Sequence, residues 1–114
     1  MSSGYNESDL SDETRNLHRA LASLQEELEA IDYYNQRIDR SAAEDLKAVL
    51  AHNRDEEVEH ATMLLEWLRR SMPQFDAAMK TYLFTTAPIT AIEAAADGAA
   101  AKGADSLGIG KLKK

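Results

Sequence analysis

The sequence predicts an all-α protein: an antiparallel hairpin of two long helices, followed by short C-terminal helices. Two observations lead to this fold class. Apolar residues recur at alternating steps of four and three over residues 17–38 and again over residues 46–67, which is the period of an amphipathic helix. No segment alternates apolar and polar residues as a half-buried strand does. With 114 residues, the chain forms one domain at most.

The first long helix is predicted from Ser11 to about Arg40. Ser11 is a suitable N-cap, and Asp12 and Glu13 place acidic groups where the helix dipole favours them. A helix of roughly 30 residues is about 45 Å long. The preceding residues, 1–10, are mostly polar and are expected to form a flexible N-terminus.

The second long helix is predicted to begin directly after a tight turn. Ser41 and Glu44 have the spacing of a capping box, and the apolar pattern continues to about Arg70. Because the connection is so short, the two helices are expected to pack side by side in opposite directions.

Two shorter helices are expected after the hairpin. Pro73 ends the second helix and can begin a third, and Pro88 can begin a fourth that Gly98 closes. The helical domain is thus predicted to span residues 11–97. Residues 98–105 are mostly Ala and Gly and are expected to form a flexible linker.

Composition restricts the chemistry. The chain has no cysteine, so metal ligands must be carboxylates, imidazoles or water. Such a set favours iron or manganese when histidine is included and calcium when it is absent. The net charge is −7, but Lys111, Lys113 and Lys114 are three of the 13 basic residues, so residues 1–110 have 10 basic against 20 acidic residues, a net charge of −10. An acidic body of this kind repels nucleic acid and attracts cations.

The N-terminal segment predicts an intracellular protein. Residues 1–10 are polar and acidic and lack the apolar core of a signal peptide, and no apolar segment reaches the length of a transmembrane helix. We therefore expect no membrane partner and, from the charge, no nucleic-acid partner.

A polar run interrupts the second predicted helix. Residues 52–60 contain one apolar residue, yet the stepping that joins Leu50 to Leu64 places Glu57 and His60 on the core-facing stripe. Burying a carboxylate and an imidazole is costly unless a partner compensates. Since Glu-x-x-His puts both side chains on one helix face, one turn apart, the pattern indicates a metal site.

The turn gives a way to align the two helices. Glu27 and Glu57 are equally far from a turn centred on residues 41–42, so they lie level in an antiparallel hairpin. Glu27 also directly precedes Leu28, a residue of the predicted seam. We therefore expect Glu27, Glu57 and His60 to meet at one height.

These three residues make only half of a two-metal site. Di-iron sites in four-helix bundles use one Glu from each of two helices and a Glu-x-x-His from each of the other two, whereas this chain has one of each. A two-helix hairpin also leaves one face of both helices bare. A homodimer would complete a four-helix bundle and bring together two sets of ligands for two metal ions.

Simpler interpretations of the same residues remain open. Glu-x-x-His arises by chance on acidic helices, and Glu57 could be an ion-paired residue with Arg37 or Arg54 as its partner. Asn35 and Asn53 fall on seam positions, where asparagine commonly sets helix register.

Here the chain resembles the encapsulated ferritins, over residues 26–37, 51–60, 65–70, 81–85 and 88–93. The resemblance implies a ferritin-like bundle and a ring-shaped assembly of dimers. It also implies a ferroxidase centre between two chains, with iron bound by the positions that match Glu27, Glu57 and His60.

The resemblance further implies a metal-uptake site on the outward side of the first helix. Glu26 and Glu29 match it and could bind Ca²⁺ or other divalent cations. Tyr33 stands where the family usually has Trp, and Tyr33 and Tyr34 match positions that support the ligands without binding metal.

Residues 106–113 resemble the targeting peptide by which cargo docks inside encapsulin shells, and the matching positions are Leu107, Ile109, Gly110 and Leu112. Spaced apolar residues after a linker suit an extended peptide that fills pockets on a partner. The expected partner is the encapsulin shell protein, and the expected location is a nanocompartment in a bacterial or archaeal cytoplasm.

The resulting prediction is a ferroxidase that oxidises Fe²⁺ to Fe³⁺ with O₂ and delivers iron for storage inside the shell. Two alternatives remain: a non-catalytic metal-binding structural cargo or adaptor, and a rubrerythrin-like di-metal peroxidase. The chain lacks the Cys₄ electron-transfer module of the last class.

Overall fold

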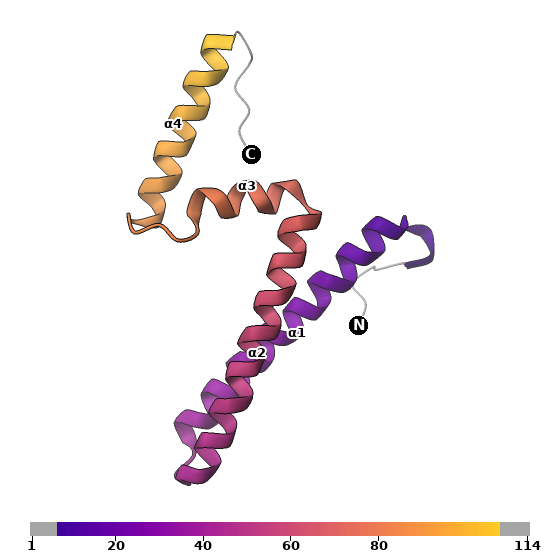
Figure 1. The fold of residues 1–114 in the computed structure, drawn as a ribbon, viewed down its shortest axis with the longest axis vertical. Helices are drawn as coiled ribbons and strands as arrows, with labels where there is room; N and C mark the ends of the chain where they lie inside the picture. The colour runs from indigo at the N-terminus through magenta and orange to yellow at the C-terminus, as the bar shows by residue number, and fades with distance from the viewer. Residues whose placement is uncertain (1–6, 108–114) are drawn as a thin grey trace. The chain divides into compact units, whose positions relative to one another are not determined.

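The computed structural model of the chain describes residues 7–107, with side chains described to residue 99 (Figure 1). All regular structure in this range is helical, which confirms the predicted fold class. The chain divides into two units, Met1–Met72 and Pro73–Lys114. The first unit holds a 3₁₀ turn, η1 (Glu7–Asp9), and the two long helices α1 (Asp12–Arg40) and α2 (Glu44–Ser71).

Helix α1 begins as the sequence predicts. The Ser11 hydroxyl accepts a hydrogen bond from the Thr14 amide at 3.2 Å, and Asp12 and Glu13 occupy the first turn. The 3₁₀ turn lies in the segment expected to be flexible. It is tied to α1 because Arg15 donates to the Glu7 carbonyl at 2.7 Å and Arg19 donates to the Glu7 carboxylate at 3.0 Å.

The predicted capping box at the hairpin turn is wrong. Ser41 instead ends α1, donating its amide to the Arg37 carbonyl at 3.0 Å, and its hydroxyl accepts from the Ala43 amide at 3.2 Å. Ala43 is the N-cap of α2 and has no side-chain cap. The extended connection separates Ser41 from the first turn of α2, so its hydroxyl stabilises the turn rather than the helix.

Helices α1 and α2 pack along a narrow apolar seam. Its buried side chains are Ala20 and Leu24 from α1 and Ala61 and Leu68 from α2. Two of these four side chains are only methyl groups, which lets the helix axes approach closely. Leu68 has no exposed surface at all.

The seam is offset by one position from the predicted one. The sequence spacing also placed Leu21, Leu28 and Trp67 on it, but these residues are 40%, 52% and 41% exposed. Adjacent residues in a helix are about 100° apart, so this offset moves a side chain from the covered face to an open one. Both helices therefore carry apolar side chains beside the seam that the hairpin leaves about half exposed.

The second unit contains α3 (Pro73–Tyr82) and α4 (Ile89–Leu107). Pro73 is the first residue of α3, as predicted, because that position needs no amide donor. The prediction that Gly98 closes the last helix is wrong, since α4 continues to Leu107 through the segment expected to be a flexible linker. Alanine has the highest helix propensity, and the alanines around Gly98 offset its cost.

Among the residues described, no helix combines the length and the apolar character that crossing a membrane requires.

Candidate metal centre

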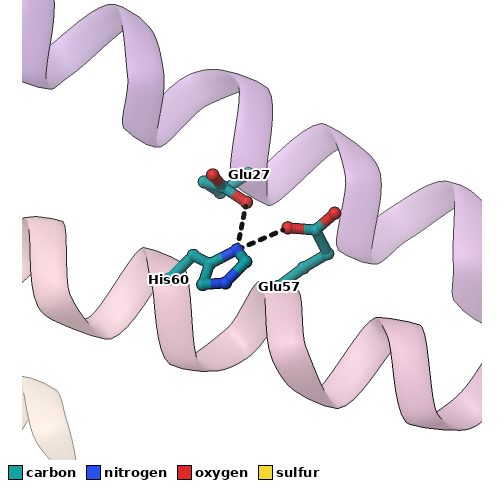
Figure 2. Close-up of side chains that lie close together, drawn as sticks. All are labelled: Glu27, Glu57 and His60. Atoms are coloured by element: carbon teal, nitrogen blue, oxygen red, sulfur yellow. Dashed lines mark hydrogen bonds and ion pairs between the residues drawn. The ribbon is translucent and has the colours of Figure 1, made fainter.

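Three side chains face one another across the α1–α2 seam (Figure 2). Glu27 comes from α1, and Glu57 and His60 come from consecutive turns of α2. His60 Nδ1 lies 3.0 Å from Glu57 Oε1 and 3.6 Å from Glu27 Oε1. The candidate ligand atoms all lie within 4.8 Å of one another. The hairpin thus brings together the three residues that sequence reasoning placed level.

The positions of these residues follow from the helix periods. Glu27 follows the buried Leu24 by three residues, so it continues the seam of α1. Glu57 precedes the buried Ala61 by four residues and continues the seam of α2 in the same way. Both carboxylates therefore point into the contact between the helices. Because the Ala61 side chain is small, the helices lie close enough there for the two carboxylates to meet.

The three ligands differ in exposure. The side chains of Glu27 and Glu57 are each 25% exposed, whereas that of His60 is 45% exposed. His60 also lies seven residues before Trp67, so both belong to the second, open face of α2. The cluster is therefore covered by the hairpin on its carboxylate side and open on its imidazole side.

The three side chains shift one another's pKa values. The hydrogen bond with Glu57 raises the pKa of Glu27, and burial adds to this effect. The same contact lowers the pKa of Glu57, and the hydrogen bond with His60 lowers it further. Hydrogen bonding to Glu57 raises the pKa of His60, against the effect of desolvation. The shifts of Glu27 and His60 both favour the protonated form, and the shift of Glu57 favours the charged carboxylate.

The donor set fits a divalent transition metal. Two carboxylate oxygens and one imidazole nitrogen are ligands that iron and manganese accept. A cation would compete with protons for these donors and would offset the negative charge of the carboxylates. Three protein donors also leave an octahedral ion with coordination positions for water, a substrate or ligands from a second chain.

The structure brings only some of the outward acidic residues into contact with the neighbouring tyrosine. The Tyr33 hydroxyl donates to Glu29 Oε2 at 3.2 Å, and this hydrogen bond raises the pKa of Tyr33. Glu26 and Glu29 line one shallow hollow on α1 together with Leu28. Within the described part of the chain, however, the group close enough to share a cation is Glu27, Glu57 and His60.

The remaining candidate residues have other partners or lie elsewhere. Tyr34 is half-buried, seven residues after Glu27, and the Arg37 guanidinium lies 5.7 Å from its ring centroid and 6.0 Å from that of Tyr33. Leu107 is the last residue of α4. The other predicted targeting residues lie outside the described range; they are Ile109, Gly110 and Leu112.

Sequence reasoning missed one contact near the cluster. Arg54, considered only as a partner for Glu57, donates to Asn35 Oδ1 on α1 at 3.0 Å. The signal in the sequence was Asn35 itself, a polar residue on an apolar stripe. Spacing alone did not identify its partner, because the long arginine side chain reaches beyond the level of its own backbone.

An all-helical hairpin with two carboxylates and a histidine between its long helices defines a protein of the ferritin-like class. A model of the EncFtn-like family matches residues 3–86, which is most of the chain, and the chain belongs to this family.

Several known proteins are similar to it. The encapsulated ferritin-like protein of Rhodospirillum rubrum is 56% identical over 115 residues, covering 91% of this chain and 82% of that protein. The encapsulin nanocompartment cargo protein EncC of Myxococcus xanthus is 36% identical over 104 residues, covering 81% and 80%. The crystal structure of protein NE0167 of Nitrosomonas europaea superposes with a TM-score of 0.73 at 61% identity, covering 75% of this chain and 97% of that one.

Proposed function

We propose that this protein is a ferroxidase that oxidises Fe²⁺ to Fe³⁺ with O₂ and delivers the iron for storage inside an encapsulin shell. The observation that carries the proposal is the convergence of Glu27, Glu57 and His60 within 4.8 Å at an open edge of the hairpin. Membership of the EncFtn-like family supports iron as the metal.

A second copy of the chain completes the centre in this proposal. Beside the seam, the hairpin carries large apolar side chains that are 40% to 60% exposed; they are Leu21 and Leu28 on α1 and Leu46, Met63 and Trp67 on α2. An apolar face of this kind is a common mark of a protein–protein interface. Because His60 lies beside Met63 and Trp67 on α2, covering this side of α2 with an identical hairpin brings a second cluster towards the first. The pair then has four carboxylates and two imidazoles, the ligand set of a di-iron four-helix bundle.

Iron is the substrate: two bound Fe²⁺ ions each give up one electron to one O₂, which takes up two protons and becomes hydrogen peroxide. Glu27 and Glu57 hold the ions at a fixed separation, and their negative charge favours the higher charge of Fe³⁺. His60 supplies a neutral nitrogen donor once its proton has left. Two ions per dimer follow from two copies of each ligand.

The outer acidic residues have a supporting role in this proposal. Glu26 and Glu29 would attract divalent cations, Ca²⁺ included, before they reach the centre, and Tyr33 would orient Glu29 through the hydrogen bond between them. Tyr34, on the seam one heptad after Glu27, would support the ligands from the turn side.

The shell is the proposed partner. The R. rubrum relative is named as encapsulated, and the M. xanthus relative is named as an encapsulin nanocompartment cargo protein. We infer that the tail of this chain docks to the shell protein through Leu107, Ile109, Gly110 and Leu112. Dimers joined into a ring would present many tails and bind with avidity. The protein would then act inside a nanocompartment in a bacterial or archaeal cytoplasm.

Substitution of the ligands tests the activity. We expect Glu57→Ala and His60→Ala each to abolish most Fe²⁺ oxidation, followed by the absorbance of Fe³⁺ under air, while circular dichroism shows intact helices. Glu56→Ala is the matched control, since Glu56 is the adjacent carboxylate and faces His52 instead, at 3.3 Å. Oxidation at the wild-type rate in both ligand variants would contradict the proposal. Metal binding without oxidation in the wild-type protein would favour the adaptor alternative.

A further inference from the structure

A polar contact links α1 and α2 close to the metal centre. Arg54 Nη1 donates to Asn35 Oδ1 at 3.0 Å, across the seam of the hairpin. The other side of the same guanidinium contacts Asp55, whose Oδ1 lies 3.1 Å from both Nε and Nη2. A planar guanidinium held on two sides has one orientation, so the contact with Asn35 has a defined direction. The Arg54 side chain is only 32% exposed.

This contact lies one turn from Glu57 on α2 and about two turns from Glu27 on α1. Arg54 precedes Glu57 by three residues and lies on the adjacent turn of α2, and Asn35 follows Glu27 by eight residues on α1. Side chains in a helix lean towards its N-terminus, so Arg54 extends from the level of the cluster towards the hairpin turn. The bond therefore joins the two helices that supply the ligands, on the turn side of the cluster.

The apolar core lies on the opposite side of the cluster. Ala20 and Leu24 precede Glu27 in α1, and Ala61 and Leu68 follow Glu57 in α2. Between residues 28 and 56, the structure buries no side chain fully. Apolar contacts resist separation of the helices but are non-directional, so they hold the axial position of one helix against the other only weakly. The directional hydrogen bond from Arg54 to Asn35, on the turn side of the cluster, can hold this axial position.

We propose that Arg54 is a positioning residue that sets, through Asn35, the register of α1 against α2 at which Glu27, Glu57 and His60 converge on a divalent cation. The inference rests on the proposed metal centre. Arg54 acts on the geometry of the ligands and does not contact the metal itself. Groups that hydrogen-bond to metal ligands commonly contribute about 10-fold to 100-fold in metal affinity, and Arg54 acts one contact further away, so its effect should lie at the lower end of this range.

Binding of Co²⁺, a spectroscopic probe for this centre, tests the proposal in the full-length chain. We expect Arg54→Met and Asn35→Ala each to weaken Co²⁺ binding by about tenfold and to alter the visible absorption spectrum of the bound ion. The double variant should be no weaker than either single variant, because both remove one contact. Arg54→Lys keeps a donor and a charge and should restore part of the affinity. Arg40→Met removes an exposed positive charge near the end of α1 and should leave binding unchanged.

The outcomes separate this inference from the proposed function. Wild-type affinity and spectrum in Arg54→Met, or losses in the two single variants that add in the double variant, would overturn the positioning role alone. Equal losses in Arg40→Met would also overturn it, since they would indicate a general effect of charge. If wild-type protein binds Co²⁺ and loses it in His60→Ala but does not oxidise Fe²⁺, the ferroxidase proposal fails and the positioning role stands. Absence of Co²⁺ binding in the wild type would overturn both.

Discussion

The two apolar faces of the hairpin differ in what covers them. On the seam, Ala20, Leu24, Ala61 and Leu68 are buried by the partner helix, whereas beside it side chains such as Leu28 and Trp67 are about half exposed. Both faces belong to the same two helices, one residue position apart. The difference shows that the hairpin satisfies only part of the apolar surface of its helices, and the exposed part is what the proposed second copy would cover, with Glu27, Glu57 and His60 at the boundary.

The largest effect on the seam should come from its fully buried residue. Leu68→Ala removes a side chain with no exposed surface, and we expect it to lower the free energy of unfolding by about 2–5 kcal/mol, as buried leucines do. The measurement is chemical unfolding followed by circular dichroism at a fixed protein concentration. Leu28→Ala is the same chemical change on the open face, where the side chain is 52% exposed. It should cost less in hairpin stability, and equal losses in both variants would remove the distinction between the two faces.

The next effect concerns assembly. Trp67→Ala truncates the largest side chain of the open face, and a buried tryptophan at an interface contributes about 2 kcal/mol or more, roughly a 30-fold change in dissociation constant. We expect dimer dissociation, measured by native mass spectrometry across a concentration series, with helix content retained. Fe²⁺ oxidation should fall in parallel. A dimer as stable as the wild type would show that this face is not the interface.

A smaller effect concerns how stability and metal affinity depend on pH through His60. Because Glu57 raises the pKa of His60, the imidazole stays charged to a higher pH than an ordinary histidine. In the metal-free protein, the stability from this contact is present below about pH 6.5, the ordinary value, and is lost as the pH rises through the raised pKa. A cation needs the neutral imidazole, so metal affinity should change in the opposite direction and rise with pH up to that pKa.

Calorimetric titration with Co²⁺ between about pH 5.5 and 8 measures this dependence, and NMR of the His60 ring in the metal-free protein measures its pKa. His52→Ala is the control, since His52 pairs with Glu56 on the exposed part of α2. A pKa of His60 below 6.5, or an affinity that does not vary with pH, would contradict the link.

The smallest effect is expected at a charge cluster in the last turns of α2, formed by Glu66, Arg69 and Arg70. Arg69 and Arg70 hold Glu66 by hydrogen bonds of 2.7–2.8 Å, and these lower the pKa of Glu66 to about 2. The resulting stability is present above the ordinary pKa of 4.5 and is lost as the pH falls towards 2. Glu66→Gln should therefore lower the thermal midpoint slightly at pH 7 and not at all near pH 2. An unchanged midpoint at both pH values would show that water screens the cluster completely.

Local sequence signals predicted much of the hairpin. The Ser11 cap and the apolar period gave both ends of α1, because capping and amphipathicity act within a few residues. Counting from the turn aligned Glu27 with Glu57, since helix rise is constant along an antiparallel pair. Two of the wrong predictions concern segments whose residues suit either of two local structures. Ser41 could cap a helix or stabilise a turn, and the alanines around Gly98 could form a linker or extend α4.

The sequence by itself determined that two long amphipathic helices form and that an acidic and imidazole-bearing turn interrupts their apolar stripes. Only the tertiary structure decided which of two adjacent stripes becomes the seam, and which polar residue Arg54 reaches. The reason is physical. Period and capping depend on neighbours along the chain, whereas the choice of a covered face depends on how the whole surfaces of two helices fit together, which apolar spacing does not encode.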